Sequence, residues 1–343
     1  MTRRRPGLAL VLAAALPLLV ACGSSSSASA PTVRRSGAAS TPTGGPTGSP
    51  TGGHTGTPSV PHRVTVSAAP WRLPVASGRQ AIVPVGRQTV ILAGGLVAGD
   101  MSTDEALRID LASGRVRRLQ PLAVPVHDVA GGLVAGVPMV VGGGNATEQD
   151  VVQRLGNGSW QVAGHLPTTR SDLSVVQRGA GAFVLGGYDG STVPTTILSL
   201  AADGSTRPVG HLARGVRYAA TARVGHTAYV FGGEVLGAEL DTVQGVDLRT
   251  GGTRTVAALP VPLGHAMAAT VAGRILLAGG RVTPDRQTAA MWWFDPATRR
   301  FTRAGTLPHP LSDAAVVSSG RRVWLLGGED PGVTDGVLTL SAR

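Results

Sequence analysis

The stretch Ala228-Tyr229-Val230-Phe231-Gly232-Gly233 is a short apolar run that ends in two glycines. Valine, tyrosine and phenylalanine favour strands, and glycine is typical of the turns that end them. The pattern occurs six times, with glycine pairs at Gly94-Gly95, Gly142-Gly143, Gly186-Gly187, Gly232-Gly233, Gly279-Gly280 and Gly327-Gly328. Successive first glycines are 48, 44, 46, 47 and 48 residues apart. The chain is therefore predicted to contain six structural repeats.

A second landmark lies fourteen residues before each first glycine, at the start of another apolar run. The residues at this offset are Gln80, Asp128, Asp172, Tyr218, His265 and Asp313. The interval from this residue to the first glycine is the same in all six repeats, and the repeats differ in length only outside it. This constancy predicts one rigid hairpin in each repeat. Periods of roughly 40 to 50 residues with four strands per repeat are typical of a β-propeller. We therefore predict an all-β fold with six blades.

The fourth repeat illustrates the expected blade, with strands at residues 218–224, 227–233, 243–248 and 253–258. The last repeat lacks sequence for a fourth strand, because only the apolar run at 337–340 follows its glycine pair. Residues 63–71 form a strand-like run that no repeat uses. We expect this N-terminal strand to complete the last blade and close the ring, which leaves no open sheet edge at the junction.

Further residues resemble those of the kelch family of propellers, and the resemblance covers essentially all of residues 62–343. They are the glycine pairs, the aspartates expected to end third strands, the Leu-Pro connections between blades, and Trp160 at the start of an outer strand. The aspartates are Asp110, Asp247 and Asp295, and the connections include Leu73-Pro74, Leu166-Pro167, Leu259-Pro260 and Leu307-Pro308. The outer-strand tryptophan of the family is replaced by Val116, Thr206, Thr253 and Phe301 in other repeats.

The N-terminal region has the organisation of an export signal followed by a linker. Arg3, Arg4 and Arg5 precede an apolar run at 7–20, and small residues follow, as in a secretory signal peptide. Leu19-Val20-Ala21-Cys22 resembles the lipobox of bacterial lipoproteins, which implies a signal peptide at 1–21 and acyl chains such as palmitate on Cys22. Residues 22–61 are rich in Ser, Gly, Thr and Pro and are expected to form a disordered tether. We thus expect a propeller at 62–343, lipid-anchored on the extracytoplasmic face of the cell membrane.

The chain has a net positive charge, and the sequence contains arginine but no lysine. The full sequence has 31 Lys plus Arg, all of them Arg, 20 Asp plus Glu and a net charge of +11. Without the five arginines of the first 62 residues, 26 remain against 20 carboxylates, a net charge near +6. Such a domain favours anionic surfaces such as lipid head groups or wall polymers. No basic cluster with interleaved aromatics points to nucleic acid.

The residues at the fixed offset are expected to surround one mouth of the central channel, because inner strands begin and second strands end on the same face. In ring order, Asp313, Gln80, Asp128 and Asp172 would form an acidic arc, with Tyr218 and His265 completing the ring. Arg79, Arg170 and Arg217 lie in the adjoining connections. Loops after the glycine pairs add Asp100, Asn145, Glu148, Tyr188, Asp189, Glu234, Arg281, Glu329 and Asp330.

Two interpretations of this ring remain open at the level of sequence. The polar groups form a site for a hydroxyl-rich or charged ligand, or they satisfy backbone groups where strands begin. We predict no metal site and no cofactor, because the aspartates come from different blades without a local ligand loop and arginines compete for them. Oxidases built on kelch-like propellers use a tyrosine cross-linked to a cysteine, and the only cysteine here is Cys22.

The leading hypothesis is a non-catalytic, monomeric envelope protein that binds a protein or glycan partner with one face of the propeller. An alternative comes from the resemblance, since periplasmic six-bladed kelch propellers include sialic acid mutarotases, which need an acid or base and an arginine. His265 would be the acid or base. A second alternative is an architectural lipoprotein.

Overall fold

The computed structural model describes residues 61–343, which form thirty β-strands and no helix. All of these residues belong to one compact unit. The predicted signal peptide, Cys22 and the linker up to residue 60 lie outside the described residues. Within residues 61–343 no helix is long and apolar enough to cross a membrane.

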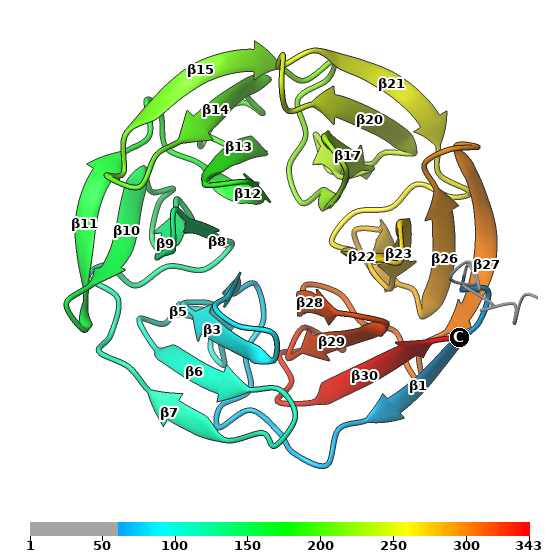
Figure 1. Ribbon diagram of the computed structural model, residues 1–343, viewed down its shortest axis with the longest axis horizontal. Helices are drawn as coiled ribbons and strands as arrows, with labels where there is room; N and C mark the ends of the chain where they lie inside the picture. The colour runs from blue at the N-terminus through cyan, green and yellow to red at the C-terminus, as the bar shows by residue number, and fades with distance from the viewer. Residues whose placement is uncertain (1–60) are drawn as a thin grey trace, which may run out of the picture. The chain divides into compact units, whose positions relative to one another are not determined.

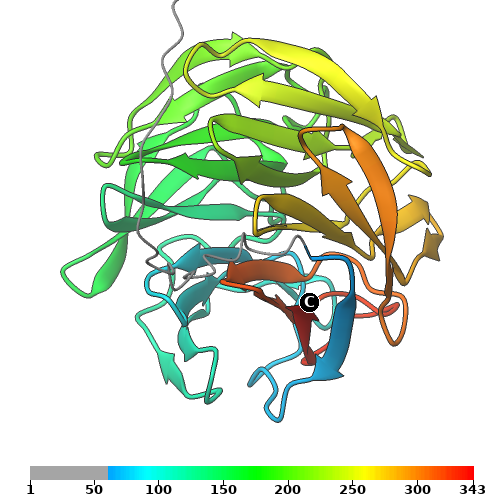
Figure 2. The same cartoon turned by 45° about the vertical axis from the view of Figure 1, so that its right-hand side comes forward.

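The strands form six four-stranded antiparallel sheets around a common centre, which confirms the six-bladed β-propeller (Figures 1 and 2). The innermost strands are β2 (Ala81–Pro84), β8 (Ala130–Val134), β12 (Ser171–Arg178), β16 (Ala220–Val224), β22 (Met267–Val271) and β28 (Ala315–Ser319). The second strands are β3 (Thr89–Ala93), β9 (Val137–Val141), β13 (Gly181–Tyr188), β17 (Thr227–Phe231), β23 (Arg274–Ala278) and β29 (Arg322–Leu326).

The outer half of each blade follows the same order. The third strands are β6 (Ala106–Asp110), β10 (Val151–Gly156), β14 (Thr196–Leu200), β20 (Thr242–Asp247), β26 (Ala290–Asp295) and β30 (Val337–Ala342). The outer strands are β7 (Val116–Arg118), β11 (Ser159–His165), β15 (Thr206–His211), β21 (Thr253–Ala258), β27 (Arg300–Thr306) and β1 (Val64–Ala68). Three small hairpins pair β4 (Leu96–Val97) with β5 (Met101–Ser102), β18 (Glu234–Val235) with β19 (Ala238–Glu239), and β24 (Arg281–Thr283) with β25 (Arg286–Gln287).

Each glycine pair joins its blade to the next one by a close backbone approach. The first pair has φ angles of +65° at Gly94 and +117° at Gly95, which L side chains rarely adopt. A Cβ on Gly94 would stand 2.6 Å from the carbonyl oxygen of Val126, in the connection to the second blade. The amide of Gly95 donates to that same oxygen over 2.7 Å. Glycine is therefore required where neighbouring blades meet.

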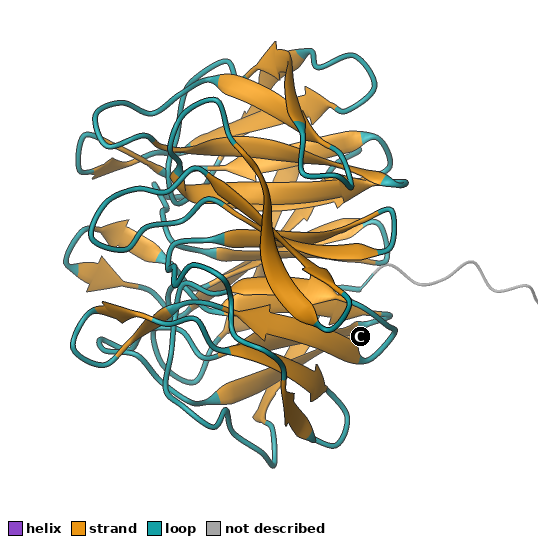
Figure 3. Ribbon diagram, turned by 90° about the vertical axis from the view of Figure 1, so that its left-hand side faces the viewer, coloured by secondary structure: helices purple, strands orange, loops and turns teal. Residues whose placement is uncertain are grey.

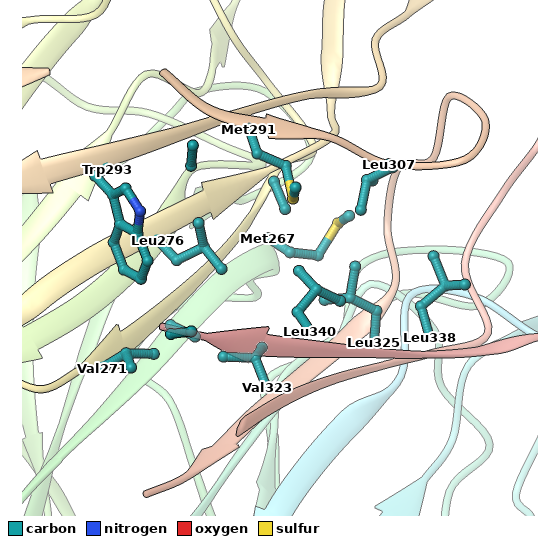
Figure 4. Packing of buried hydrophobic residues seen from close by; sticks show 14 of the residues in the cluster. Met267, Val271, Leu276, Met291, Trp293, Leu307, Val323, Leu325, Leu338 and Leu340 are labelled. Atoms are coloured by element: carbon teal, nitrogen blue, oxygen red, sulfur yellow. The ribbon is translucent and has the colours of Figure 1, made fainter. Parts of the chain in front are cut away.

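The hydrophobic core consists of six layers, one between each pair of adjacent blades. Side chains alternate along each second strand, so Val90 and Leu92 face one neighbouring blade while Ile91 faces the other. Figure 4 shows the layer between the fifth and sixth blades, where Met267 and Trp293 pack against Leu325 and Leu340. Second strands are thus buried on both sides, which explains their continuous apolar sequence.

The two faces of the ring differ in loop length (Figure 3). We call one the mouth face: it carries the connections between blades, the loops that follow the glycine pairs and the three small hairpins. The other is the turn face, which carries the short turns from innermost to second strands and from third to outer strands. Several of these turns have only two residues, such as 135–136 and 272–273. Both ends of the described chain lie on the turn face, where the amide of His62 donates to the carbonyl oxygen of Arg343.

Closure of the ring by the N-terminal strand is confirmed. β1 pairs antiparallel with β30 from Val64 opposite Ala342 to Ala68 opposite Leu338. Val64 and Val66 also pack against the core layer of the fifth and sixth blades. The last blade thus takes three strands from the C-terminus and its outer strand from the N-terminus.

Deletion of residues 63–70 is expected to lower the thermal unfolding midpoint sharply, because β30 loses its hydrogen-bonded partner and becomes an open edge. Circular dichroism during heating measures this midpoint. Deletion of residues 51–58, which lie before β1, is the matched control and should leave the midpoint within about 2 °C, since no described strand is lost. An equal midpoint for both deletions would contradict closure by β1.

Candidate functional site

The mouth of the channel is surrounded by a ring of residues in the left-handed backbone conformation. They are Arg79, Asp128, Asp172, Tyr218, His265 and Asp313, with φ between +51° and +59°. Their backbones form a chain of hydrogen bonds around the mouth: each of Asp172, Tyr218, His265, Asp313 and Arg79 donates its amide to the carbonyl of the ring residue in the preceding blade. We call these six residues the mouth ring.

The sequence predicted Gln80 in the first blade, and the structure corrects this to Arg79. In every blade the carbonyl that accepts from a second glycine lies two residues before the ring residue, and in the first blade that carbonyl belongs to Ser77. The hairpin between β2 and β3 has one more residue than the others, so the ring residue lies fifteen residues before Gly94. Gln80 lies just inside the channel, where its amide binds the Ser77 hydroxyl.

In five of the six blades the innermost strand begins two residues after its ring residue, whereas β12 of the third blade begins at Ser171 and leaves Asp172 unpaired in its ladder. In the fourth blade β16 begins at Ala220, two residues after Tyr218. A left-handed residue cannot continue a strand ladder, which explains the displacement. The ring residues therefore project from bends, and this directs them over the mouth.

Arg79 extends across the mouth and contacts three other blades. Its guanidinium donates through Nε and Nη2 to Glu329, through Nη1 to Asp128 over 3.1 Å, and through Nη1 to the Tyr218 hydroxyl over 3.3 Å. Burial alone would lower the pKa of Arg79, but the carboxylates of Asp128 and Glu329 outweigh burial and raise it. Arg79 is therefore a permanent positive charge over the channel.

A second group of contacts lies on the side of the third and fourth blades. Arg217 contacts Asp172 with Nε at 2.7 Å from Oδ2, and it stacks over the rings of Tyr188 and Tyr218 at 4.5 Å from each centroid. Burial, reinforced by the charge of Asp128, raises the pKa of Asp172 to about 7 despite Arg217. Burial likewise raises the pKa of Tyr218, so its phenol stays protonated and donates to Asp128.

His265 is enclosed on the side of the fifth and sixth blades. Its Nδ1 lies 2.7 Å from Asp313, its Nε2 lies 3.7 Å from Glu234, and its ring stacks on Tyr218 with 3.7 Å between centroids. Burial lowers the pKa of His265, but Asp313 and Glu234 together outweigh burial and raise it to about 9. Arg281 completes this group by contacting both Asp313 and Glu329.

The predicted acidic arc is therefore not an open acidic surface. Arg79, Arg217 and Arg281 lie between the carboxylates, and each carboxylate of the mouth ring is within salt-bridge distance of a basic group. Charges can be buried in this way only if they are paired. The interlocked side chains form a polar floor that separates the channel below, of about 350 Å³ and lined largely by Ala, Gly and Val, from the loops above.

Arg170 and His127 also differ from the sequence-based expectations. Arg170 is buried, and its guanidinium donates to the carbonyls of Gly186 and Thr196, so it fixes a connection rather than facing the mouth. His127 was not singled out from the sequence, but it lies 3.4 Å from Asp128 and 2.8 Å from the Ser102 hydroxyl. The only feature of the sequence that could have indicated a place for His127 at the mouth is its position directly before the ring residue Asp128. Within residues 61–343 no group of three or more His, Cys, Asp or Glu is arranged to hold a metal ion.

Fold and site together define a six-bladed β-propeller whose channel is closed at one end by a floor of paired charges. A solved structure titled "Structure of YjhT" shares this fold, with a TM-score of 0.69 and 15% sequence identity, over 79% of this chain and 99% of that one. No family model matches the sequence. No curated protein matches it either. At this identity the similarity establishes the fold alone.

Replacing Arg79 by methionine is expected to cost about 3 to 5 kcal/mol of unfolding free energy, because Glu329 and Asp128 lose a buried charged partner. Urea denaturation measures the loss. Arg72→Met is the matched control, since Arg72 pairs with Asp335 at an exposed position and should cost about 0 to 1 kcal/mol. Similar small losses for both variants would show that the floor is not held by Arg79.

The imidazole of His265 is expected to titrate near pH 9, against about 6.5 in the unfolded chain. Between these values the folded protein keeps a proton that the unfolded chain releases. This contribution to stability is therefore complete below pH 6.5 and is lost as the pH rises through 9. NMR titration of the imidazole measures the pKa, and Asp313→Asn should lower it, because Glu234 alone then opposes the effect of burial. A wild-type midpoint at 6.5 would contradict the buried ion pair.

Proposed function

We propose that this protein is a kelch-type, lipid-anchored envelope protein that binds a protein partner with its mouth face and acts outside the cytoplasm. The anchor and location rest on the signal-like residues 1–21 and on Cys22. The binding role is supported by apolar side chains on the mouth face. Among the described residues, the exposed large apolar side chains there are Val75, Met101, Leu236 and Val261.

Leu236 is the observation that carries the proposal. It lies at the tip of the hairpin of β18 and β19, with 99% of its surface exposed. Leu236 and Gly237 both have positive φ, +51° and +75°, as in a type I′ turn, where Asn-Gly is the favoured pair. A left-handed leucine costs about 1 kcal/mol. The Leu236 side chain thus costs folding free energy and regains none by burial within the propeller. A contact with a partner explains why leucine stands at this position.

Further exposed apolar side chains occur in other loops of the mouth face. Val261 lies in the connection that follows β21 of the same blade, whereas Met101, 61% exposed, begins β5 in the corresponding hairpin of the first blade, on the opposite side of the ring. Charged residues surround these positions, including Glu239 and Arg286 in the adjacent hairpins. Exposed apolar groups with a polar rim are typical of protein interfaces, and favour a protein over a glycan as the partner.

The arrangement of His265 favours binding over catalysis. At neutral pH the imidazole holds its proton, with both ring nitrogens facing carboxylates and one face covered by Tyr218. A general base must be unprotonated and within reach of a substrate proton. The cavity of about 130 Å³ at the mouth ring is lined also by channel-wall residues such as Val129, Ala219 and Ala314, so it lies on the channel side of the ring. This favours the floor as a rigid support for the loops.

Replacing Leu236 by asparagine is expected to separate binding from stability. Affinity capture from the cell envelope should recover the partner at least tenfold less well, because the apolar tip is lost. The free energy of unfolding should stay equal or rise by about 1 kcal/mol, because asparagine accepts positive φ. Quantitative mass spectrometry and urea denaturation are the two measurements.

Val162→Asn is the matched control, since Val162 is 41% exposed on β11, away from the mouth face. It should change capture less than twofold. The proposal fails if the Leu236→Asn variant captures every envelope protein as well as the wild type does. It also fails if the protein accelerates the anomerisation of a sialic acid and His265→Gln abolishes that acceleration.

A further inference from the structure

The turn face carries a concentration of arginines that the mouth ring does not use. Near the turns from innermost to second strands lie Arg87, Arg178, Arg223 and Arg322. Near the outer turns and the chain ends lie Arg63, Arg115, Arg249, Arg299, Arg300 and Arg343. Arg87, Arg223 and Arg300 are exposed and form no salt bridge with any carboxylate of residues 61–343. This face is therefore strongly positive.

The carboxylates are distributed in the opposite way. Those on the turn face are Asp110, Asp203, Asp247 and Asp295, and each accepts hydrogen bonds from the backbone of its own turn. Every other Asp and Glu of the described chain lies in a loop, hairpin or connection of the mouth face. The propeller thus has one positive and one negative side.

The shape of the turn face suits a flat, extended partner. Its turns are short, and Figure 3 shows the shorter connections on the right-hand side and the longer loops on the left. Arg223 lines the wide lower end of the channel, a cavity of about 240 Å³. A positive surface of this extent attracts anionic lipid head groups, each arginine near the bilayer adding to the attraction.

The described chain also begins on this face. Pro61, its first residue, accepts a hydrogen bond from the buried Arg274 through its carbonyl oxygen. The preceding 60 residues include Arg34 and Arg35 and contain no Asp or Glu. Cys22, the predicted lipid attachment site, precedes Pro61 in the same segment.

We propose that the turn face docks on an anionic phospholipid bilayer. Arginines of the turn face contact lipid phosphates, while the carboxylates of the mouth face are repelled from the same surface. Docking therefore sets the orientation of the ring, with its mouth directed away from the membrane. This goes beyond partner binding, because the membrane contact uses the opposite face and different residues.

The test is vesicle co-sedimentation of residues 61–343, which contain all six blades and their closure. Vesicles of phosphatidylcholine with 30% phosphatidylglycerol should retain the protein, and pure phosphatidylcholine should not. The triple variant Arg87→Gln, Arg223→Gln, Arg300→Gln should lower the partition coefficient roughly 100-fold, about fivefold for each arginine. Binding should weaken as salt rises from about 0.05 to 0.3 M, because exposed charges are screened.

Arg72→Gln, Arg214→Gln, Arg286→Gln is the matched control, because it removes the same charge from exposed positions on the mouth face. It should change the partition coefficient less than threefold. Equal losses in both triple variants would overturn the proposal, because attraction would then depend on net charge alone. Retention by polyphosphate or DNA without retention by anionic vesicles would also overturn it.

Discussion

The close backbone contact at each glycine pair is the constraint on which the rest of the propeller depends. The amide of the second glycine donates to a carbonyl two residues before the ring residue of the next blade, as Gly95 does to Val126 and Gly328 to Ser77. No side chain fits between the two backbones. The contact therefore fixes the spacing of neighbouring blades, and with it the position of every ring residue. The same geometry repeated six times brings groups that are distant in sequence to one mouth.

Charge pairing at the mouth then links the blades through side chains. Arg79 connects its own blade with three others, and His265 connects the fourth, fifth and sixth blades through Tyr218, Glu234 and Asp313. Buried charges are stable only when they are paired with opposite charges. When one partner is removed, the other stays buried and its desolvation is no longer compensated. The polar residues of the mouth thus act together as a rigid floor. The side chains that can contact a partner are therefore those of the loops above this floor.

Most of the fold could be predicted from the sequence, because glycine pairs and apolar strands are local signals. The mouth was harder. Gln80 was placed in the ring because one extra residue in a hairpin cannot be located by counting, whereas the hydrogen bond to Ser77 identifies Arg79. Arg170 was assigned to the mouth because a sequence does not give the direction of a long side chain. The acidic arc was overestimated because its arginine partners come from other blades. The positive φ of Leu236 had no sequence signal, since Leu-Gly is an unusual pair for this turn.

Closure by β1 has a consequence for the order in which the protein is built. The first strand of the described chain can complete its sheet only after β30, the last strand, has been made. A growing chain therefore carries an unpaired strand and an incomplete ring throughout synthesis, and contacts between its two ends form late because they are the most distant in sequence. The ring of such a chain therefore stays open until its C-terminal residues arrive.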